Sequence, residues 1–227
     1  TLKDVLRKIP PPVVKAAEEI LVLDDASTDK TFQMGVEFKH ELGWKNLTII
    51  HNEKNLGYGG NQKKGYHYFM EKNFDAVVML HGDAQYPPSE IPSLVGPLEK
   101  NEADMSFGSR MTGNPLKGGM PLWKYAGNKF LTTYANATLG MNLSEYHSGF
   151  RAYRIDALKK IDLDSCSNNF VFDTDIVIEF KKKNLLIVES TIPTHYGPES
   201  RQIRAIPVLR YGLQIMTRTT LYAIKHR

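Results

Sequence analysis

The sequence has one cysteine, no long apolar run and almost no excess of charge of either sign. Cys166 has no second cysteine in the chain to pair with, which excludes an internal disulfide and fits a reducing compartment. The longest stretch without a charged residue, 130–144, is interrupted by Thr, Asn and Gly and is shorter than the ~20 apolar residues of a membrane-spanning helix. The first residues do not have the pattern of a signal peptide, so we expect a cytoplasmic chain.

Composition indicates a globular protein. The chain has 227 residues, of which 41% are hydrophobic, and this excludes wholesale disorder and collagen-like repeats. Its 29 basic and 25 acidic residues give a net charge of +4, which is too small to indicate a nucleic-acid partner. No internal repeat or Gly/Ser linker divides the chain. We therefore expect one large domain over 1–204, followed by an amphipathic helix over 205–227.

Short apolar runs alternate with longer amphipathic stretches. The runs predict strands at 19–23, 47–50, 76–80, 103–107 and 185–189. The amphipathic stretches predict helices at 29–42, 60–72, 89–101, 122–138 and 172–182. In the helix at 89–101, Ser89 is the expected N-cap, and the apolar stripe consists of Ile91, Leu94, Val95 and Leu98. This alternation predicts a layered α/β domain with a mostly parallel sheet.

Acidic residues follow two of the predicted strands. Asp24 and Asp25 end one strand, and Asp83 follows another. Ligands of parallel α/β sheets bind beyond the carboxyl ends of the strands, so both acidic clusters should face one cleft. Ser27 or Thr28 is suited to cap the next helix. Capping does not explain two adjacent carboxylates, whose repulsion a ligand or metal would offset.

Two further segments have the chemistry of a phosphate site. The glycine-rich run 52–61 precedes a helix, and glycines there allow backbone amides to approach a ligand at the helix N-terminus. Asp83, with His81 two residues before it, is suited to hold a divalent ion on a diphosphate, because Mg²⁺ uses one or two carboxylates and completes its shell with phosphates and water. A neutral imidazole adds no charge and is softer than Mg²⁺ prefers, so His81 lies either on the metal or just behind its ligands.

The order of these motifs is more specific than any one of them. Asp-Asp-x-Ser-x-Asp is followed by Asn-x-Gly, by the strand-end segment with Gln and Pro-Pro, and by Ser-Gly-Phe-Arg-Ala-Tyr at 148–153. Over about 19–204 this order resembles the inverting family-2 glycosyltransferases of the GT-A fold. Within them it is similar to the dolichyl-phosphate mannose synthases and other polyprenyl-phosphate glycosyltransferases.

The resemblance implies a GT-A α/β/α domain with a mostly parallel mixed sheet. It also implies transfer of a hexose, with inversion, from a UDP- or GDP-sugar to a polyprenyl (dolichyl-type) phosphate, with Mg²⁺ or Mn²⁺ as cofactor. The family begins with a strand ending in Pro-x-Tyr-Asn-Glu. This sequence begins with what looks like the helix after that strand, so we expect the first strand to be missing. Mannose synthases of this group usually have Asp-x-Asp where this chain has His-Gly-Asp at 81–83, so His81 either lies just behind the metal ligands or indicates a different donor preference.

The resemblance implies a role for each matching residue. The donor-binding residues would be Asp24, Asp25, Asn55, Gly57, Lys64, Asp83 and Gln85. The metal ligands would be Asp83 and His81. The acceptor-binding residues would be Arg110, Ser148, Gly149, Arg151, Tyr196 and Arg201. The catalytic acids near the sugar would be Asp175, which is favoured, and Asp173, both in the segment 172–175.

Three functions stay open on the residues alone. The first is sugar transfer to a lipid phosphate, the second is transfer to a glycan hydroxyl, and the third is an inactive module that binds nucleotide sugars. A hydroxyl acceptor must lose a proton and needs a carboxylate base. A phosphomonoester is already anionic near neutral pH and needs cations instead. Arginines in the acceptor segments would supply them: Arg110, Arg151, Arg201 and Arg204.

The segment 206–227 predicts a cationic amphipathic helix. Its apolar residues are Leu209, Leu213, Met216, Leu221 and Ile224, and its basic residues are Arg210, Arg218, Lys225 and Arg227. Such a helix can lie in the headgroup region of a bilayer and would hold the cleft near a lipid phosphate at the cytoplasmic face of a membrane. Two alternatives are a helix that packs on its own domain and a helix that precedes a membrane segment.

Overall fold

The computed structural model describes residues 2–193 and 205–225, with side chains from 209 onward in the second range. The strands are β1 (Ile20–Asp24), β2 (Leu47–His51), β3 (Ala76–Met79), β4 (Met105–Ser109), β5 (Arg151–Arg154) and β6 (Ile187–Thr191). The helices are α1 (Leu2–Arg7), α2 (Pro11–Ala16), α3 (Thr31–Leu42), α4 (Tyr58–Glu71), α5 (Ile91–Glu99), α6 (Leu122–Leu139), α7 (Ile155–Leu158), α8 (Phe172–Lys182) and α9 (Ala205–Lys225). All the strands and helices predicted from the sequence pattern are present, with ends shifted by a few residues.

Among the described residues, the strands pair in both parallel and antiparallel directions. β1 and β2 pair in parallel, with Asp24 opposite His51 at the carboxyl end. The other four strands have the order β3-β5-β4-β6, in which β5 is antiparallel to both of its neighbours and β4 is parallel to β6. β5 was not predicted, because its four residues begin and end with arginine and lack the apolar run of a buried strand.

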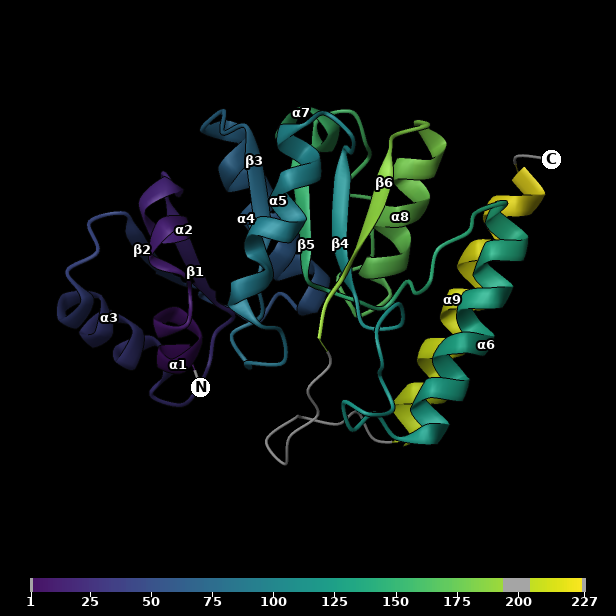
Figure 1. Ribbon diagram of the computed structural model, residues 1–227, viewed down its shortest axis with the longest axis horizontal. Coiled ribbons are helices and arrows are strands. Elements are labelled where there is room, and N and C mark those ends of the chain that lie inside the picture. Colours follow the sequence, from purple (N-terminus) through teal and green to yellow (C-terminus); the bar gives the residue numbers. More distant parts are fainter. Residues whose placement is uncertain (1, 194–204, 226–227) are drawn as a thin grey trace.

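Helices cover both faces of the sheet, as Figure 1 shows. On one face α5 packs over β3, β4, β5 and β6, with Leu94 fully buried beside Phe150 and Ala152. On the other face α4 and α8 enclose a second core around Tyr153 and Phe172. Alternate residues of β5 thus serve opposite cores, which is the pattern expected of a sheet that is covered on both sides.

Two predicted helix caps differ from the structure. Ser89 does not cap α5: it lies inside a 3₁₀ turn, η1 (Pro88–Glu90), and the helix begins at Ile91 without a side-chain cap. Pro87 and Pro88 fix the backbone dihedral φ here and favour this tight entry into the helix. At α3 neither Ser27 nor Thr28 is the cap, because the helix begins later and Asp29 Oδ1 accepts the Thr31 N–H at 2.9 Å.

The predicted helix at the end of the chain is present as α9, and it lies beside α6 at one end of the molecule (Figure 1). Its inner face is buried at Ile215 and Thr219, and Tyr134 of α6 lies 2.6 Å from the Thr220 hydroxyl. Its outer face leaves four apolar side chains exposed, namely Leu209, Leu213, Leu221 and Ile224. None of the described helices is long and apolar enough to span a bilayer.

Candidate functional site

Three polar segments follow the carboxyl ends of β1, β3 and β4. β1 ends at Asp24, β3 leads into the turn with His81 and Asp83, and β4 ends just before Arg110. β3 and β4 are both antiparallel to β5, so they are parallel to each other and end at the same edge of the sheet. This edge is where open α/β sheets bind ligands.

Asp25 holds the glycine-rich loop in place. Its carboxylate accepts the backbone N–H groups of Leu56, at 2.8 Å, and Gly57, at 3.0 Å, and the Asn52 amide at 2.9 Å. The Asn55 amide donates to the Asp25 carbonyl at 3.1 Å. Gly57 has φ of +80°, and a Cβ there would lie 2.7 Å from the Asn168 carbonyl oxygen, so only glycine fits. The predicted donor residues Asp25, Asn55 and Gly57 therefore form one connected unit.

Other side chains of the protein offset the negative charge of Asp24, which lies next to Asp25 in the sequence. Its buried carboxylate lies 2.5 Å from His51 Nδ1. Lys64 donates to the Asn52 side chain at 2.6 Å, and the Asn52 amide also donates to Asn61. The repulsion expected between Asp24 and Asp25 is thus offset by groups of the protein. These are the His51 ring, the Asn52 side chain that Lys64 contacts, and the backbone N–H groups that Asp25 accepts.

His81 is directed at a tyrosine. Its Nε2 lies 3.3 Å from the Tyr58 hydroxyl, and burial lowers the pKa of His81, so the ring is neutral near pH 7. Asp83 is half-buried, and its Oδ1 accepts the Gln85 N–H at 3.1 Å. Within 2–193 and 205–225 no three His, Cys, Asp or Glu side chains are grouped as a metal site. A metal here would therefore depend on Asp83 and on oxygens brought by a ligand.

Tyr58 joins four segments that are far apart in the sequence. Its hydroxyl donates to Asp173 Oδ2 at 2.8 Å, and its ring lies 4.9 Å from that of Phe170. Gly149 lies against the same group: a Cβ at this position would be 2.4 Å from the Tyr58 hydroxyl and 2.5 Å from His81 Nε2. The glycine-rich loop, the strand-end turn, the 148–153 motif and the 172–175 segment therefore meet at one point.

The two acids of the 172–175 segment face different neighbours. Asp173 is 4% exposed and lies in the Tyr58 cluster; its Oδ1 accepts no hydrogen bond from the described residues, although Arg151 lies 3.8 Å away. Burial raises the pKa of Asp173 to about 6, against the opposing effect of Arg151. Asp175 instead accepts the Ser167 N–H at 2.8 Å and pairs with Arg218 of α9 at 3.5 Å.

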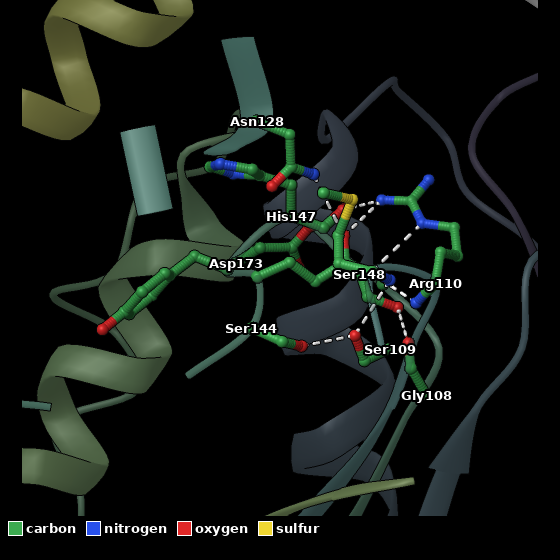
Figure 2. Close-up of polar contacts among 12 residues, drawn as sticks. Gly108, Ser109, Arg110, Asn128, Ser144, His147, Ser148 and Asp173 are labelled. Atoms are coloured by element: carbon green, nitrogen blue, oxygen red, sulfur yellow. Dashed lines mark hydrogen bonds and ion pairs between the residues drawn. The ribbon is translucent and has the colours of Figure 1, made fainter. Parts of the chain in front are cut away.

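Arg110 is paired with a buried acid (Figure 2). Its backbone N–H donates to Glu145 Oε1 at 2.6 Å, and its guanidinium to Oε2 at 2.7 Å. Burial alone would raise the pKa of Glu145, but Arg110 lowers it below its usual range. The Asn128 amide also reaches Glu145, at 3.3 Å, and brings α6 to the site. Beside them Ser148 donates its hydroxyl to the Gly108 carbonyl at 2.5 Å.

Arg151 is fully buried. Its guanidinium donates to the backbone carbonyls of Ser148 at 2.6 Å, Tyr146 at 2.9 Å and Asp173 at 2.9 Å. From this buried position Arg151 supports the backbone of the 148–153 motif and of the residues before it. The other two predicted acceptor residues, Tyr196 and Arg201, lie outside the described residues, as does Arg204.

Sequence reasoning missed four polar residues of the site: Tyr58, Asn128, Glu145 and His147. His147 Nδ1 lies 2.9 Å from the Tyr211 hydroxyl of α9, and burial lowers the pKa of His147 to about 4. A signal existed for Glu145, which is the only acidic residue between Asp104 and Asp156. No pattern in the sequence indicated that Tyr58 would reach α8.

Comparison with known proteins finds similar sequences and a similar fold. The family described as Glycosyl transferase family 2 matches residues 1–162. The low-salt glycan biosynthesis hexosyltransferase Agl6 of Haloferax volcanii is 31% identical over 86% of this chain and 46% of its own length. The undecaprenyl-phosphate mannosyltransferase of Micrococcus luteus is 30% identical over 77% of this chain and 70% of its own length. The chain thus spans about half the length of the first relative.

Solved structures show the same fold. Glucosyl-3-phosphoglycerate synthase from Mycobacterium tuberculosis, in complex with Mn²⁺, UDP-glucose and phosphoglyceric acid, superposes with a TM-score of 0.70 at 18% identity. The superposition covers 98% of this chain and 74% of that one. The expected GT-A fold is therefore confirmed.

Gly149→Ala should destabilise the protein by about 1–3 kcal/mol, because the new methyl group must displace Tyr58 or His81. Urea unfolding followed by circular dichroism measures the change. Gly96→Ala is the matched control: no atom lies within 4 Å of its Cβ, and alanine inside α5 should be neutral or stabilising by about 0.5–1 kcal/mol. Equal stability of the two variants would contradict the close packing at Gly149.

Asp173 should make stability depend on pH. Its pKa is about 6 in the fold and 3.8 ordinarily, so its contribution is full below pH 3.8 and is lost as pH rises through 6. The free energy of unfolding of the native chain, minus that of Asp173→Asn, should fall by about 2 kcal/mol between pH 4 and pH 7. Denaturant titrations across this range measure the difference. A difference that does not change with pH would show that the pKa of Asp173 is not raised.

Proposed function

The chain belongs to glycosyl transferase family 2, and we propose that it transfers a hexose from a nucleotide-diphosphate sugar to a polyprenyl phosphate. The observation that carries the proposal is the meeting of four motifs at Tyr58, His81, Gly149 and Asp173. The resemblance assigns two of these motifs to the donor and the diphosphate, one to the sugar and one to the acceptor. Their convergence gives a single place where donor and acceptor can react.

Several features support a lipid phosphate as the acceptor. Relatives named for this chemistry include the Micrococcus mannosyltransferase and a dolichyl-phosphate N-acetylglucosaminyltransferase of Methanococcus voltae. The carboxylates of Glu145 and Asp175 are engaged by Arg110 and Arg218, and Asp173 accepts from Tyr58. A phosphomonoester needs no base to become a nucleophile near neutral pH. A site in which most acids are already paired suits such an acceptor.

A glycan hydroxyl is the second candidate acceptor, and one observation favours it. Asp173 Oδ1 is buried and accepts no hydrogen bond from the described residues, while burial raises the pKa of this acid to about 6. A carboxylate with a pKa near the working pH is the usual form of a general base. The two acceptors therefore differ in whether the reaction needs Asp173 as a base.

The donor would lie between the Asp25 loop and the strand-end turn. Asp24, Asp25, Asn55 and Lys64 would form the nucleoside side, with Gly57 held against Asp25; the Asn168 carbonyl, which accepts the Gly59 N–H, already covers the start of α4 that the sequence suggested for a phosphate. Asp83, supported by Gln85, is the residue suited to hold Mg²⁺ or Mn²⁺, since one carboxylate with phosphate oxygens and water satisfies Mg²⁺. When bound, the metal would neutralise the diphosphate as it leaves. His81 would support this site through Tyr58.

The chain's own residues would orient the reactants for inversion. The acceptor oxygen attacks the anomeric carbon from the face opposite the diphosphate, so the new C–O bond forms as the bond to the diphosphate breaks. Arg110, held by Glu145, and Ser148 would contact the acceptor, and Tyr58 with Asp173 would lie beside the sugar. Arg151 would hold the backbone of these segments in place through its hydrogen bonds to the Ser148 and Asp173 carbonyls.

Membrane contact would come from the helices that flank the acceptor side. Residues 105–144 and 200–227 contain no Asp or Glu, and they include α6 and α9. α9 leaves Leu213 and Ile224 exposed, and α6 leaves Trp123 and Phe130 exposed. A cationic and apolar surface of this kind binds anionic bilayers. We assign the transfer to 1–204 and membrane attachment at the cytoplasmic face to the α6–α9 side, including 205–227.

Donor binding should depend on Asp83 and on a divalent metal. Asp83→Ala should abolish the metal-dependent part of UDP- or GDP-sugar binding, because the diphosphate then lacks its counter-ion, and His81→Ala should have a milder effect. Titration calorimetry with Mn²⁺ and with EDTA measures this without turnover. Glu71→Ala removes an exposed acid from the end of α4 and serves as the control. Equal affinity in EDTA and Mn²⁺ would rule out the metal assignment.

Replacing the two acids of α8 should separate the acceptors. With a short polyprenyl phosphate, Asp173→Asn and Asp175→Asn should keep kcat within about tenfold, because a phosphate needs no base. The asparagine oxygen can still accept the Tyr58 hydrogen bond, so the site should keep its shape. Product formation measured by mass spectrometry gives the rates. A loss of about 10²–10⁴-fold in Asp173→Asn would identify Asp173 as a base and contradict an acceptor that needs none. Transfer by the unaltered chain to a glycan hydroxyl but not to the polyprenyl phosphate would support the second candidate.

A further inference from the structure

A groove of about 320 Å³ lies between α9 and the residues that precede α8. Its walls include two arginines and two leucines of α9, Arg210, Arg218, Leu213 and Leu221, facing Ser167 and Val171. Asp175 joins the two walls, because one of its oxygens accepts the Ser167 N–H and the other pairs with Arg218. The groove is therefore a fixed feature on the α9 side of α8, away from the Tyr58 cluster.

The lining is cationic and apolar at once. The two arginines are eight residues apart, about 12 Å along the helix axis, on the face of α9 that lines the groove. Arg210 is exposed and forms no ion pair within the described part of the chain. Leu213 is 66% exposed and Leu221 is 49% exposed, and none of the described residues that line the cavity is acidic. A ligand that satisfies both properties must be an anionic amphiphile.

We propose that this groove binds the head group of an anionic phospholipid of the bilayer. The forked guanidinium groups of Arg210 and Arg218 would contact the phosphodiester, since arginine pairs with phosphate through two N–H groups. Leu213 and Leu221 would contact the upper acyl chains. The proposal rests on the membrane contact proposed above and extends it. It adds a specific binding site for one class of lipid on the membrane-facing side of the protein.

The position of the groove connects the lipid to the cleft. The segment after Ser167 covers the start of α4: the Asn168 carbonyl accepts the Gly59 N–H at 2.8 Å. Phe170 of the same segment packs on the Tyr58 ring. A head group held by Arg218 would thus lie next to the loop that supports the donor side.

The test uses the full chain and vesicles of phosphatidylcholine with or without phosphatidylglycerol, and measures binding by co-sedimentation. The unaltered chain should bind only the anionic vesicles. The double variant Arg210→Lys/Arg218→Lys keeps the charge but loses the forked contacts, so its affinity should fall about tenfold. Unchanged affinity of this variant would show that attraction is by general charge alone and would overturn the site.

A second variant tests the shape of the groove without changing charge. Thr217→Trp should fill the cavity and weaken binding by a similar factor, whereas Gln33→Trp, on an exposed position of α3 outside the α6–α9 side, should not. Thermal unfolding confirms that each variant is folded. Equal binding by both tryptophan variants would also overturn the proposal.

Two measurements distinguish a lipid site from a site for free phosphate or for the sugar donor. Inorganic phosphate at millimolar concentration should not displace the vesicles; displacement would mean that the groove takes free phosphate and not a lipid. Calorimetric titration of UDP- and GDP-sugars should give the same affinity in all groove variants. Failure of donor binding would count against the proposed transfer reaction, and failure of vesicle binding against the groove.

Discussion

The site depends on the buried guanidinium of Arg151. Burying a charge is costly unless hydrogen bonds and an opposite charge compensate it. Here backbone carbonyls of Tyr146, Ser148 and Asp173 accept its N–H groups, and the Asp173 carboxylate lies 3.8 Å away. The cation therefore joins the start of β5, the loop before it and the first turn of α8. If Arg151 were removed, these carbonyls would lose its N–H groups, and both the 148–153 motif and Asp173 would lose their common support.

Tyr58 makes the matching connection from the donor side. The Asp25 carboxylate fixes the loop that ends at Gly57, and this places Tyr58 at the start of α4 with its hydroxyl on Asp173. His81 meets the same hydroxyl as a neutral ring. Two adjacent features thus keep the negative charge low around Tyr58: His81 carries no charge, and a raised pKa favours the protonated form of Asp173 below pH 6. In the proposed reaction Asp83 is then the acid that would hold a metal on the diphosphate.

Sequence patterns predicted the parts of this fold that depend on long apolar runs. The stripe of Ile91, Leu94 and Leu98 is buried as its spacing predicted, and the strands that end at Asp24 and before Asp83 coincide with apolar runs that are mostly half-buried. β5 and the α5 cap could not be predicted in this way, because a four-residue strand between arginines and a proline-fixed turn owe their form to tertiary neighbours and to backbone geometry. The same difference holds for the site. Its segments were identified from their sequence motifs, whereas the contacts between those segments could not be predicted from the sequence.

The difference is clearest for the charged residues. From the sequence, Asp24 and Asp25 indicated an external ligand, and Arg151 indicated an acceptor phosphate. In the fold His51, backbone amides and carbonyl oxygens already satisfy all three. A charge in a motif can act by holding the motif's own backbone, and sequence alone does not separate that role from ligand contact. The contacts of α9 extend this point: Arg218 pairs with Asp175, and Tyr211 meets His147. α9 is therefore joined both to α8 and to the segment before β5, two contacts that neither motif indicated.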